Sequence, residues 1–301
     1  RLGPIFKPQP SVISPWSFIL GAKEEVPLAI YVHKRPHYFK EVLDHLRKVR
    51  GIGNVPVLVI SMDSVEKEML DIARTIDFVP YRIVFHPPRL DLLPMQPLLA
   101  IKAHWMWLQD MLWTRIPETK EYDGHIALLE EDHVVTPDYL EVISLLIDLK
   151  ARSCPRCWAV CVKYGCRDMS DTEAYKVCRT HSVMNTGIAF NRSLYAAIKS
   201  SDFASFADGW DWTLFHLAQT GQMADMMLAP AVSRIRNIGV KGATVKDDGD
   251  DFLHQQLDYK DVGKNASFRR SHFWIDHTVP MHYVPPAWEP LYLGSLGFIA
   301  T

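Results

Sequence analysis

The sequence lacks an excess of charge of either sign. Its 33 Lys and Arg residues nearly balance its 35 Asp and Glu residues, giving a net charge of -2. The two signs are interspersed, so neither nucleic-acid binding nor electrostatic attachment to a membrane is indicated. No window holds the roughly 18 consecutive apolar residues of a membrane span. We therefore expect any membrane anchor to lie upstream of Arg1.

Several motifs of common enzyme classes are also missing. The sequence has no G-x-x-x-x-G-K-[ST], G-x-G-x-x-G, H-E-x-x-H or G-x-S-x-G pattern. These absences argue against kinases, dehydrogenases, zinc proteases and serine hydrolases.

Cysteines are few and confined to one stretch, at positions 154, 157, 161, 166 and 178. Cys154 and Cys157 form a C-x-x-C pair, which has three interpretations: half of a zinc site, a redox pair or a local disulfide. Cys161 and Cys166 are poorly spaced for a second zinc pair. A redox pair prefers a helix N-terminus after a strand, whereas this pair follows an expected helix. The disulfide is favoured and would imply an oxidising compartment.

The composition is that of an ordinary folded domain. Hydrophobic residues make up 48% of the 301 positions, enough for a sizeable core. The nine Trp residues suit a cleft that stacks on sugars, although core packing is the simpler explanation for any single one. Residues 1–25 are rich in proline and are interpreted as an N-terminal leader. We expect one catalytic domain over 26–301, with a nucleotide-binding half at 26–133 and an acceptor-binding half at 134–301.

The first half of the expected domain alternates short apolar runs with amphipathic segments. Strands are predicted at 28–33, 55–61 and 81–85. A helix is predicted to start at Pro36, and another after Asp63 or Ser64, with Val65, Met69 and Ile72 on its apolar side. This β-α-β-α-β order predicts a mostly parallel sheet flanked by helices, which binds ligands at the carboxyl ends of its strands.

The remaining elements follow less regularly. A long helix is predicted at 98–113 and a fourth strand at 126–129. Thr136-Pro137-Asp138 is interpreted as the N-cap, N1 and N2 positions of the next helix. A strand at 183–190 and a helix at 208–218 are expected, and the polar segment 241–268 is interpreted as a mobile active-site loop.

The acidic triplet Glu130-Glu131-Asp132 follows the fourth predicted strand directly. Three carboxylates at the exit of a buried strand are unfavourable without partners. A Mg²⁺ or Mn²⁺ ion that also binds a diphosphate would supply one, since it needs only one or two protein carboxylates. A solvated acidic turn that caps the following helix is an equally good explanation from spacing alone.

The segment Asp208-Gly209-Trp210-Asp211-Trp212 is a second candidate site. Desolvation by flanking indoles would raise the pKa of Asp211, which suits a general base acting on a sugar hydroxyl. The alternative is a helix start in which Asp208 is the N-cap and the Trp residues pack in the core. Taken alone, this alternative is favoured.

Together these motifs resemble the N-acetylglucosaminyltransferase II family. The acidic segment Leu128–His133, followed by Thr136-Pro137-Asp138-Tyr139, is similar to its metal motif. Five further matches occur in the family's order: 32–36, 61–63, 102–107, 154–157 and 210–213. The resemblance covers roughly residues 28 to 245.

The resemblance implies a GT-A glycosyltransferase fold, UDP-GlcNAc as donor, Mn²⁺ (or Mg²⁺) and inverting β-1,2 transfer to the 2-hydroxyl of a mannose-terminated glycan. It also implies a Golgi-lumenal, type II membrane protein of N-glycan biosynthesis. The roles it implies are metal binding by Asp132; nucleotide-sugar binding by Arg35, Asp63, Lys102, His104, Glu130 and Glu131; catalysis by Asp211 as base; and acceptor contacts from Asp208, Trp210 and Trp212.

The sequence also departs from this family. Asn237 stands about where the family has a metal-binding His, and 233–242 is closer to the related N-acetylglucosaminyltransferase I pattern. Asp132 could therefore be the sole protein ligand of the metal. Two alternatives stay open: a transferase acting on the enzyme I site or on O-mannose glycans, and a non-catalytic glycan-binding domain on the same fold.

Overall fold

The structure, a computed structural model, describes residues 5–7, 25–87, 96–163, 176–181, 183–240 and 274–279. The predicted mobile loop at 241–268 and most of the leader lie outside these residues. Ten strands in the described part of the chain form one sheet, and two more form a small second sheet. The strands of the large sheet are β1 (Ile5–Lys7), β2 (Leu28–Val32), β3 (Leu58–Met62), β4 (Tyr81–Phe85), β5 (His125–Glu130), β7 (Cys157–Cys161), β8 (Lys176–Thr180), β9 (Ile188–Asn191), β10 (Met226–Pro230) and β12 (Trp274–Val279).

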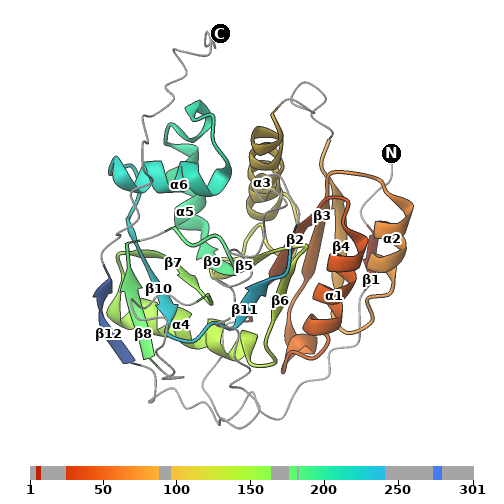
Figure 1. The fold of residues 1–301 in the computed structure, drawn as a ribbon, viewed down its shortest axis with the longest axis horizontal. Coiled ribbons are helices and arrows are strands. Elements are labelled where there is room, and N and C mark those ends of the chain that lie inside the picture. The colour runs from red at the N-terminus through yellow and green to blue at the C-terminus, as the bar shows by residue number, and fades with distance from the viewer. Residues whose placement is uncertain are drawn as a thin grey trace.

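The strand order in the large sheet is β1-β4-β3-β2-β5-β9-β7-β10-β8-β12. The run β4-β3-β2-β5 is parallel throughout. It is near-continuously apolar because both of its faces are covered. β9 is antiparallel to β5 and to β7, and marks the change from the N-terminal to the C-terminal half. The predicted α/β fold with a mostly parallel central sheet and flanking helices is confirmed (Figure 1).

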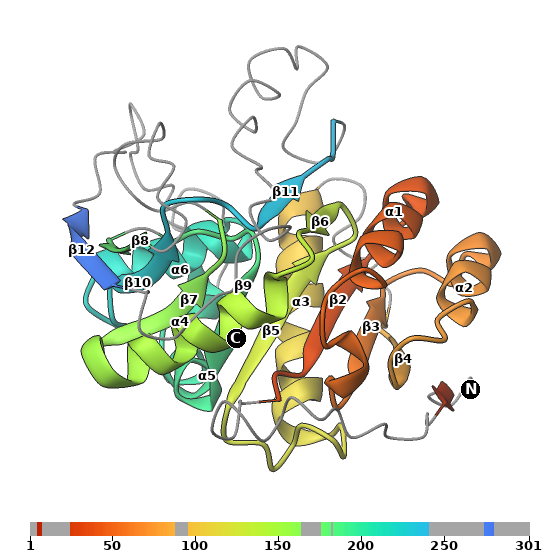
Figure 2. The ribbon, with the colours of Figure 1, turned by 90° about the horizontal axis from the view of Figure 1, so that it is seen from below.

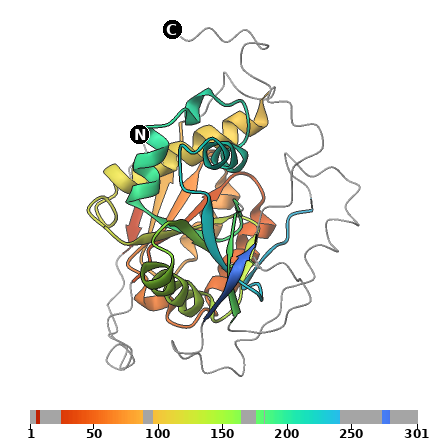
Figure 3. The same ribbon diagram turned by 90° about the vertical axis from the view of Figure 1, so that its left-hand side faces the viewer.

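Helices cover both faces of this sheet (Figure 3). The described helices are α1 (Pro36–Leu46), α2 (Lys67–Arg74), α3 (Pro97–Thr114), α4 (Tyr139–Ser153), α5 (Arg192–Lys199) and α6 (Trp210–Gln219). Side chains of α1, α2 and α4 share one hydrophobic cluster with the sheet, whereas those of α3, α5 and α6 share a second cluster. A hydrophobic core therefore covers each face of the sheet, and the predicted site residues lie at the edge of the sheet. None of the described helices combines the length and the apolar composition that crossing a bilayer requires.

The small sheet pairs β6 (His133–Val135) with β11 (Ile235–Asn237), antiparallel. β6 follows the acidic triplet, and its register sets Asn237 opposite His133. Figure 2 shows this pair beside α1. The pairing brings the segment after residue 235 back over the triplet, although the two are about a hundred residues apart in the sequence.

The predicted start of α2 is wrong. The helix begins at Lys67, without a side-chain cap, rather than directly after Asp63 or Ser64. The Asp63 carboxylate instead binds the His33 ring, and the Ser64 hydroxyl donates to His33 O. Val65, expected on the apolar face, is 63% exposed because it precedes the helix.

The predicted start of α4 is also too early, since the helix begins at Tyr139. Asp138 is at the N-cap position, but its side chain makes no cap hydrogen bond. Its carboxylate binds the fully buried Arg234 guanidinium instead, with Nε 3.0 Å from Oδ2. Further along, only the end of the predicted strand at 183–190 is a strand, β9, and α6 starts at Trp210 with Gly209 rather than Asp208 as its N-cap.

The C-x-x-C pair is a disulfide between Cys154 and Cys157. This confirms the favoured interpretation and excludes a zinc or free-thiol role for the pair. Cys178 is also disulfide-bonded, whereas Cys161 is a buried free thiol.

Candidate active site at the carboxyl edge of the sheet

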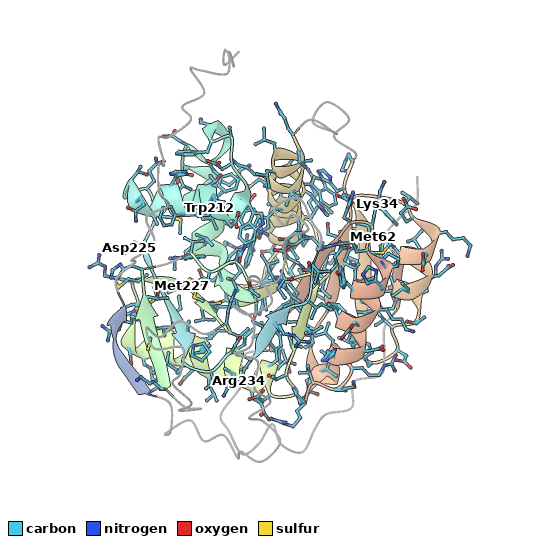
Figure 4. The ribbon with its side chains drawn as sticks, in the orientation of Figure 1. Lys34, Met62, Trp212, Asp225, Met227 and Arg234 are labelled. Carbon is cyan, nitrogen blue, oxygen red and sulfur yellow. A yellow bond between two sulfur atoms is a disulfide. The ribbon has the colours of Figure 1, made fainter. Side chains whose placement is uncertain are left out.

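Three neighbouring strands present polar residues at the same edge. The register of β3, β2 and β5 aligns Ser61 with Tyr31 and Tyr31 with Glu130. The residues that follow these strands therefore meet at the carboxyl edge, where parallel sheets bind ligands. Figure 4 shows Lys34 and Met62 on the N-terminal half of this edge and Trp212 on the C-terminal half.

Glu131 and Arg35 connect two of these strand ends. Arg35 Nε donates to Glu131 Oε1 at 2.5 Å, and the His33 backbone N–H donates to Glu131 Oε2 at 2.7 Å. Both Glu131 oxygens are therefore bound by protein donors, and the residue is only 2% exposed. Glu131 holds the loop after β2 against the loop after β5 and has little capacity left for a ligand.

Asp132 has one oxygen bound and one free of hydrogen bonds. Its Oδ2 lies 2.8 Å from Arg35 Nη1, while Oδ1 is buried and lacks a hydrogen-bond partner among the described residues. Burial raises the pKa of Asp132, partly offset by the Arg35 charge. A buried carboxylate oxygen without a partner fits a divalent cation, which prefers oxygen ligands. Ligand atoms of Glu130, Asp132 and His133 lie within 4.8 Å of one another.

His133 fits such a cation poorly despite its position. Its Nδ1 accepts the Glu130 backbone N–H at 3.1 Å. Burial lowers the pKa of His133 to about 3, so the ring is neutral and its single proton lies on Nε2. Neither ring nitrogen then offers a free lone pair to a cation. The remaining candidate ligand atoms are the carboxyl oxygens of Asp132 and of Glu130 beside it.

Glu130 is protonated more readily than an ordinary carboxylic acid. Burial and the charge of Asp132 raise its pKa to about 8. The charge of Asp211 adds to this rise, so the acidic triplet and Asp211 are electrostatic neighbours. Tyr31 links them, because Trp210 Nε1 donates to Tyr31 OH at 3.2 Å and Tyr31 also hydrogen-bonds the Glu130 side chain.

The segment after β11 packs against Asp132. The Ile238 N–H donates to Asp132 O at 2.9 Å. A Cβ added to Gly239 would lie 2.2 Å from Asp132 Oδ2, so only glycine allows this approach. Asn237 Oδ1 accepts the Gly239 N–H at 2.7 Å, which commits its amide oxygen to the backbone. Asn237 therefore shapes the segment behind Asp132.

Asp63, His33 and His104 form a polar cluster at the end of β3. His33 Nδ1 lies 2.6 Å from Asp63 Oδ1, and this hydrogen bond raises the pKa of His33. His104 Nε2 is 2.7 Å from Ser61 Oγ, and its Nδ1 is 3.7 Å from Asp63 Oδ2. Burial lowers the pKa of His104 to about 4, so the ring is neutral. The structure thus brings the predicted residues Asp63 and His104 together, with Arg35 nearby on the loop after β2.

Asp211 lies in the first turn of α6. Burial raises the pKa of its carboxyl group above the ordinary range, although backbone N–H groups oppose the shift. Asn185 Nδ2 donates to Asp211 Oδ2 at 2.9 Å. Asn185 was missed in the sequence, because it lies before β9 in no motif that signals a contact with α6.

Two predicted residues lie apart from the nucleotide cluster. Lys102 Nζ donates to Phe206 O at 2.6 Å, and Asp208 Oδ2 lies 3.4 Å from His216 Nε2. Trp210 is buried and stacks on Trp105 with ring centroids 4.8 Å apart, as the core-packing interpretation predicts. Trp212 is partly exposed next to Asp211.

Comparisons with known proteins agree on one family. The family model described as N-acetylglucosaminyltransferase II (MGAT2) matches residues 9–97 and 95–265. The curated alpha-1,6-mannosyl-glycoprotein 2-beta-N-acetylglucosaminyltransferase of Arabidopsis thaliana is 29% identical over 231 residues, which is 64% of this chain and 53% of that protein. The Homo sapiens protein of the same name is 29% identical over 65% of this chain and 54% of that protein. The chain thus spans about half the length of the curated relatives that it matches.

A solved structure, S. aureus TarS 1-349 in complex with UDP-GlcNAc, overlaps with a TM-score of 0.44 at 10% identity, over 82% of this chain and 69% of that chain. A TM-score at this level does not establish the fold, which is identified instead from the order and direction of the strands in the sheet.

Proposed function

Because this chain belongs to the N-acetylglucosaminyltransferase II family, we propose that it is an inverting GT-A glycosyltransferase. It moves N-acetylglucosamine from UDP-GlcNAc to the 2-hydroxyl of a mannose in an N-glycan, forming a β-1,2 linkage. Residues 26–133 serve the nucleotide and 134–301 the acceptor. The observation that carries this proposal is the buried Asp132 oxygen without a hydrogen-bond partner among the described residues, next to Glu130, which Tyr31 connects to Trp210, the neighbour of Asp211.

The donor side comprises the cluster at the ends of β2 and β3. Asp63 accepts the uracil N–H, and His104 and Arg35 line the nucleotide pocket. His104 suits this role because it is neutral and fixed by Ser61. Glu130 contacts the sugar or ribose, and Glu131 orients the loop that carries Arg35.

Asp132, whose Oδ1 has no hydrogen-bond partner among the described residues, would hold Mn²⁺ or Mg²⁺, with Glu130 beside it. The ion would supply positive charge to neutralise the departing diphosphate, so that no acid residue would need to protonate it. His133 would add no ligand, because its Nδ1 lone pair accepts the Glu130 N–H. The Asn237 amide oxygen accepts the Gly239 N–H, and Asn237 is given no place in the proposed metal site.

Asp211 is the base. Its unprotonated carboxylate takes the proton of the mannose 2-hydroxyl as that oxygen bonds to the anomeric carbon. The bond from that carbon to the diphosphate breaks, and UDP leaves with the electron pair. A single displacement inverts the anomeric centre. The raised pKa of Asp211 brings its basicity closer to neutral pH, which favours proton transfer. Asp208, Trp210 and Trp212 form the acceptor side.

The Golgi lumen is the proposed compartment. The Cys154–Cys157 disulfide supports it, because such bonds persist in oxidising compartments and are rare in the cytosol.

The test is incubation with UDP-GlcNAc, Mn²⁺ and a panel of defined mannosides, followed by mass measurement and linkage analysis. We expect one added N-acetylhexosamine, β-1,2-linked to mannose of an N-glycan. Preference for the enzyme I site or for O-mannose would reassign the acceptor. If no mannoside is modified and UDP with Mn²⁺ gives no thermal stabilisation, the chain is a non-catalytic domain instead.

A further inference from the structure

Lys102 lies on α3 and reaches the segment that precedes α6. Its Nζ donates to Phe206 O at 2.6 Å and lies 4.6 Å from the centre of the Phe203 ring. The residue is only 6% exposed. A hydrogen bond from a charged amine in a dry environment is stronger than a neutral one. Lys102 therefore ties the 203–209 segment, which ends directly before α6, to α3.

The same face of α3 contacts α6 itself. Trp105, one helical turn after Lys102, stacks on Trp210 at 4.8 Å with an interplanar angle of 3°, and on Phe203 at 5.7 Å. Residues three apart lie on one helix face. Lys102 and Trp105 thus hold the segment on both sides of the α6 N-terminus, and Asp211 is the second residue of that helix.

His104 lies on a different face of α3. Residues two apart on a helix are separated by about 200°, and His104 is directed to Ser61 and Asp63. Lys102 therefore lies away from the cluster proposed to bind the nucleotide.

Burial lowers the pKa of Lys102 to about 8, and the charge of Asp208 opposes this shift. Among the described residues, His216, which lies beside Asp208, also interacts electrostatically with Lys102. Burying a charged lysine is unfavourable unless its contacts compensate for the lost hydration. The contact that compensates is the hydrogen bond to the Phe206 carbonyl, and the negative charge of Asp208 adds to it from further away; both groups precede α6.

We propose that Lys102 is a positioning residue for catalysis, which holds residues 203–209 so that Asp211 meets the acceptor hydroxyl, and that it does not bind the donor. This rests on the proposed function, since positioning Asp211 matters only if Asp211 is the base.

The test compares Lys102→Met, Lys102→Arg and a control, Lys199→Met, with the wild-type chain. Lys199 is an exposed lysine on α5 whose partner is Asp110. For each protein we would measure kcat, the KM for UDP-GlcNAc, the Kd for UDP with Mn²⁺, and backbone hydrogen exchange over residues 203–209.

Lys102→Met should lower kcat by about 10- to 100-fold, as small misplacements of a reacting group do. It should leave the KM and Kd unchanged and speed exchange over 203–209. Lys102→Arg keeps the charge and a donor, so it should recover part of kcat and slow the exchange. The control should match wild type in every measurement.

A raised donor KM or UDP Kd with normal kcat would overturn the proposal, because it would show that Lys102 binds the nucleotide. Unchanged kcat and exchange in Lys102→Met would overturn it too. If Lys102→Met does not fold, Lys102→Arg is compared with the wild-type chain. Loss of exchange protection over residues 203–209 in Lys102→Arg would then contradict the proposal that a charged donor at this position holds the segment. If the wild-type chain transfers no sugar, the proposed function fails, while the exchange data still decide whether Lys102 holds this segment.

Discussion

Arg35 Nη1 lies 2.8 Å from Asp132 Oδ2, and the other oxygen of Asp132 has no hydrogen-bond partner among the described residues. The guanidinium thus compensates part of a buried negative charge and orients the carboxylate. In the proposed function, the oxygen without a hydrogen-bond partner is the one that would meet the cation. Under that proposal, one aspartate would hold a divalent ion with little other help from the protein.

Asp132→Asn should remove Mn²⁺-dependent UDP binding, because the neutral amide loses the charge that attracts the ion. We expect a loss of at least about 100-fold in affinity, beyond the effect of changing an outer-shell partner. Titration calorimetry with UDP, with and without Mn²⁺, measures it. The control is Asp148→Asn, a change at a partly buried aspartate of α4 that pairs with the exposed Arg152. Equal Mn²⁺ dependence in Asp132→Asn and wild type would remove Asp132 from the metal site.

Gly239→Ala should weaken Mn²⁺-dependent UDP binding without unfolding the protein. The new Cβ would lie 2.2 Å from Asp132 Oδ2, so either that carboxylate or the chain must shift. We expect a loss of about 10- to 100-fold in affinity, as for other changes to residues that support and orient a metal ligand. Gly53→Ala is the control, since its Cβ would only make a 3.8 Å contact with Phe78 O. Normal affinity in Gly239→Ala would contradict the close approach.

Transfer should depend on pH through Asp211. Burial raises the pKa of this carboxyl group above the ordinary range, and only the unprotonated form can accept the acceptor proton. The rate kcat/KM should therefore rise with pH through a pKa higher than that of an ordinary aspartate, and fall away below it. A rate profile with no acid limb down to the ordinary carboxyl range would contradict this assignment.

The same shift has a consequence for stability. A carboxyl group whose pKa is raised on folding destabilises the folded state once pH rises through that pKa. Asp211→Asn should therefore keep or raise the Tm at neutral pH relative to wild type, with the difference disappearing in acid. Thermal unfolding at several pH values measures it, and a lower Tm at neutral pH would contradict the burial of an unfavourable charge.

Arg234→Met should be strongly destabilising. The Arg234–Asp138 pair is fully buried, and removing one partner leaves an uncompensated charge, at a loss of roughly 3–5 kcal/mol. Figure 4 shows Arg234 well away from Trp212, so the effect should be on folding rather than on catalysis. Arg152→Met, at the exposed Asp148 pair, should change stability by at most about 1 kcal/mol. Equal denaturant midpoints for the two variants would contradict the prediction.

The parallel half of the fold was predictable because its signals are local. Pro36 and the apolar spacing after it placed α1, and the run before Glu130 placed β5. The starts of α2 and α4 were wrong for a shared reason. Asp63 or Ser64 was expected to cap α2 and Thr136 to cap α4, but the Asp63 carboxylate binds His33 and the Thr136 hydroxyl donates to Asp138, whose carboxylate binds Arg234.

The acidic triplet and Asp211 could be found from the sequence, because buried strand ends and flanking Trp residues make carboxylates conspicuous. The contacts that distinguish Glu131 from Asp132 could not be predicted. That Glu131 is fully occupied and Asp132 half free depends on Arg35, which arrives from another strand. Asn185 carried no signal at all, since its contact with Asp211 depends on how α6 packs against the sheet.

In the proposed mechanism, Asp211 performs the chemistry while Asp132 binds the donor's metal. Asp211→Asn separates the two roles when it is assayed for transfer to a mannoside and for UDP binding with Mn²⁺ in the same preparation, with Asp225→Asn as a surface control. We expect kcat to fall by about 10²- to 10⁴-fold, the contribution of a general base, while UDP affinity stays at the wild-type value. Full transfer activity in Asp211→Asn would contradict the role of Asp211 as the base.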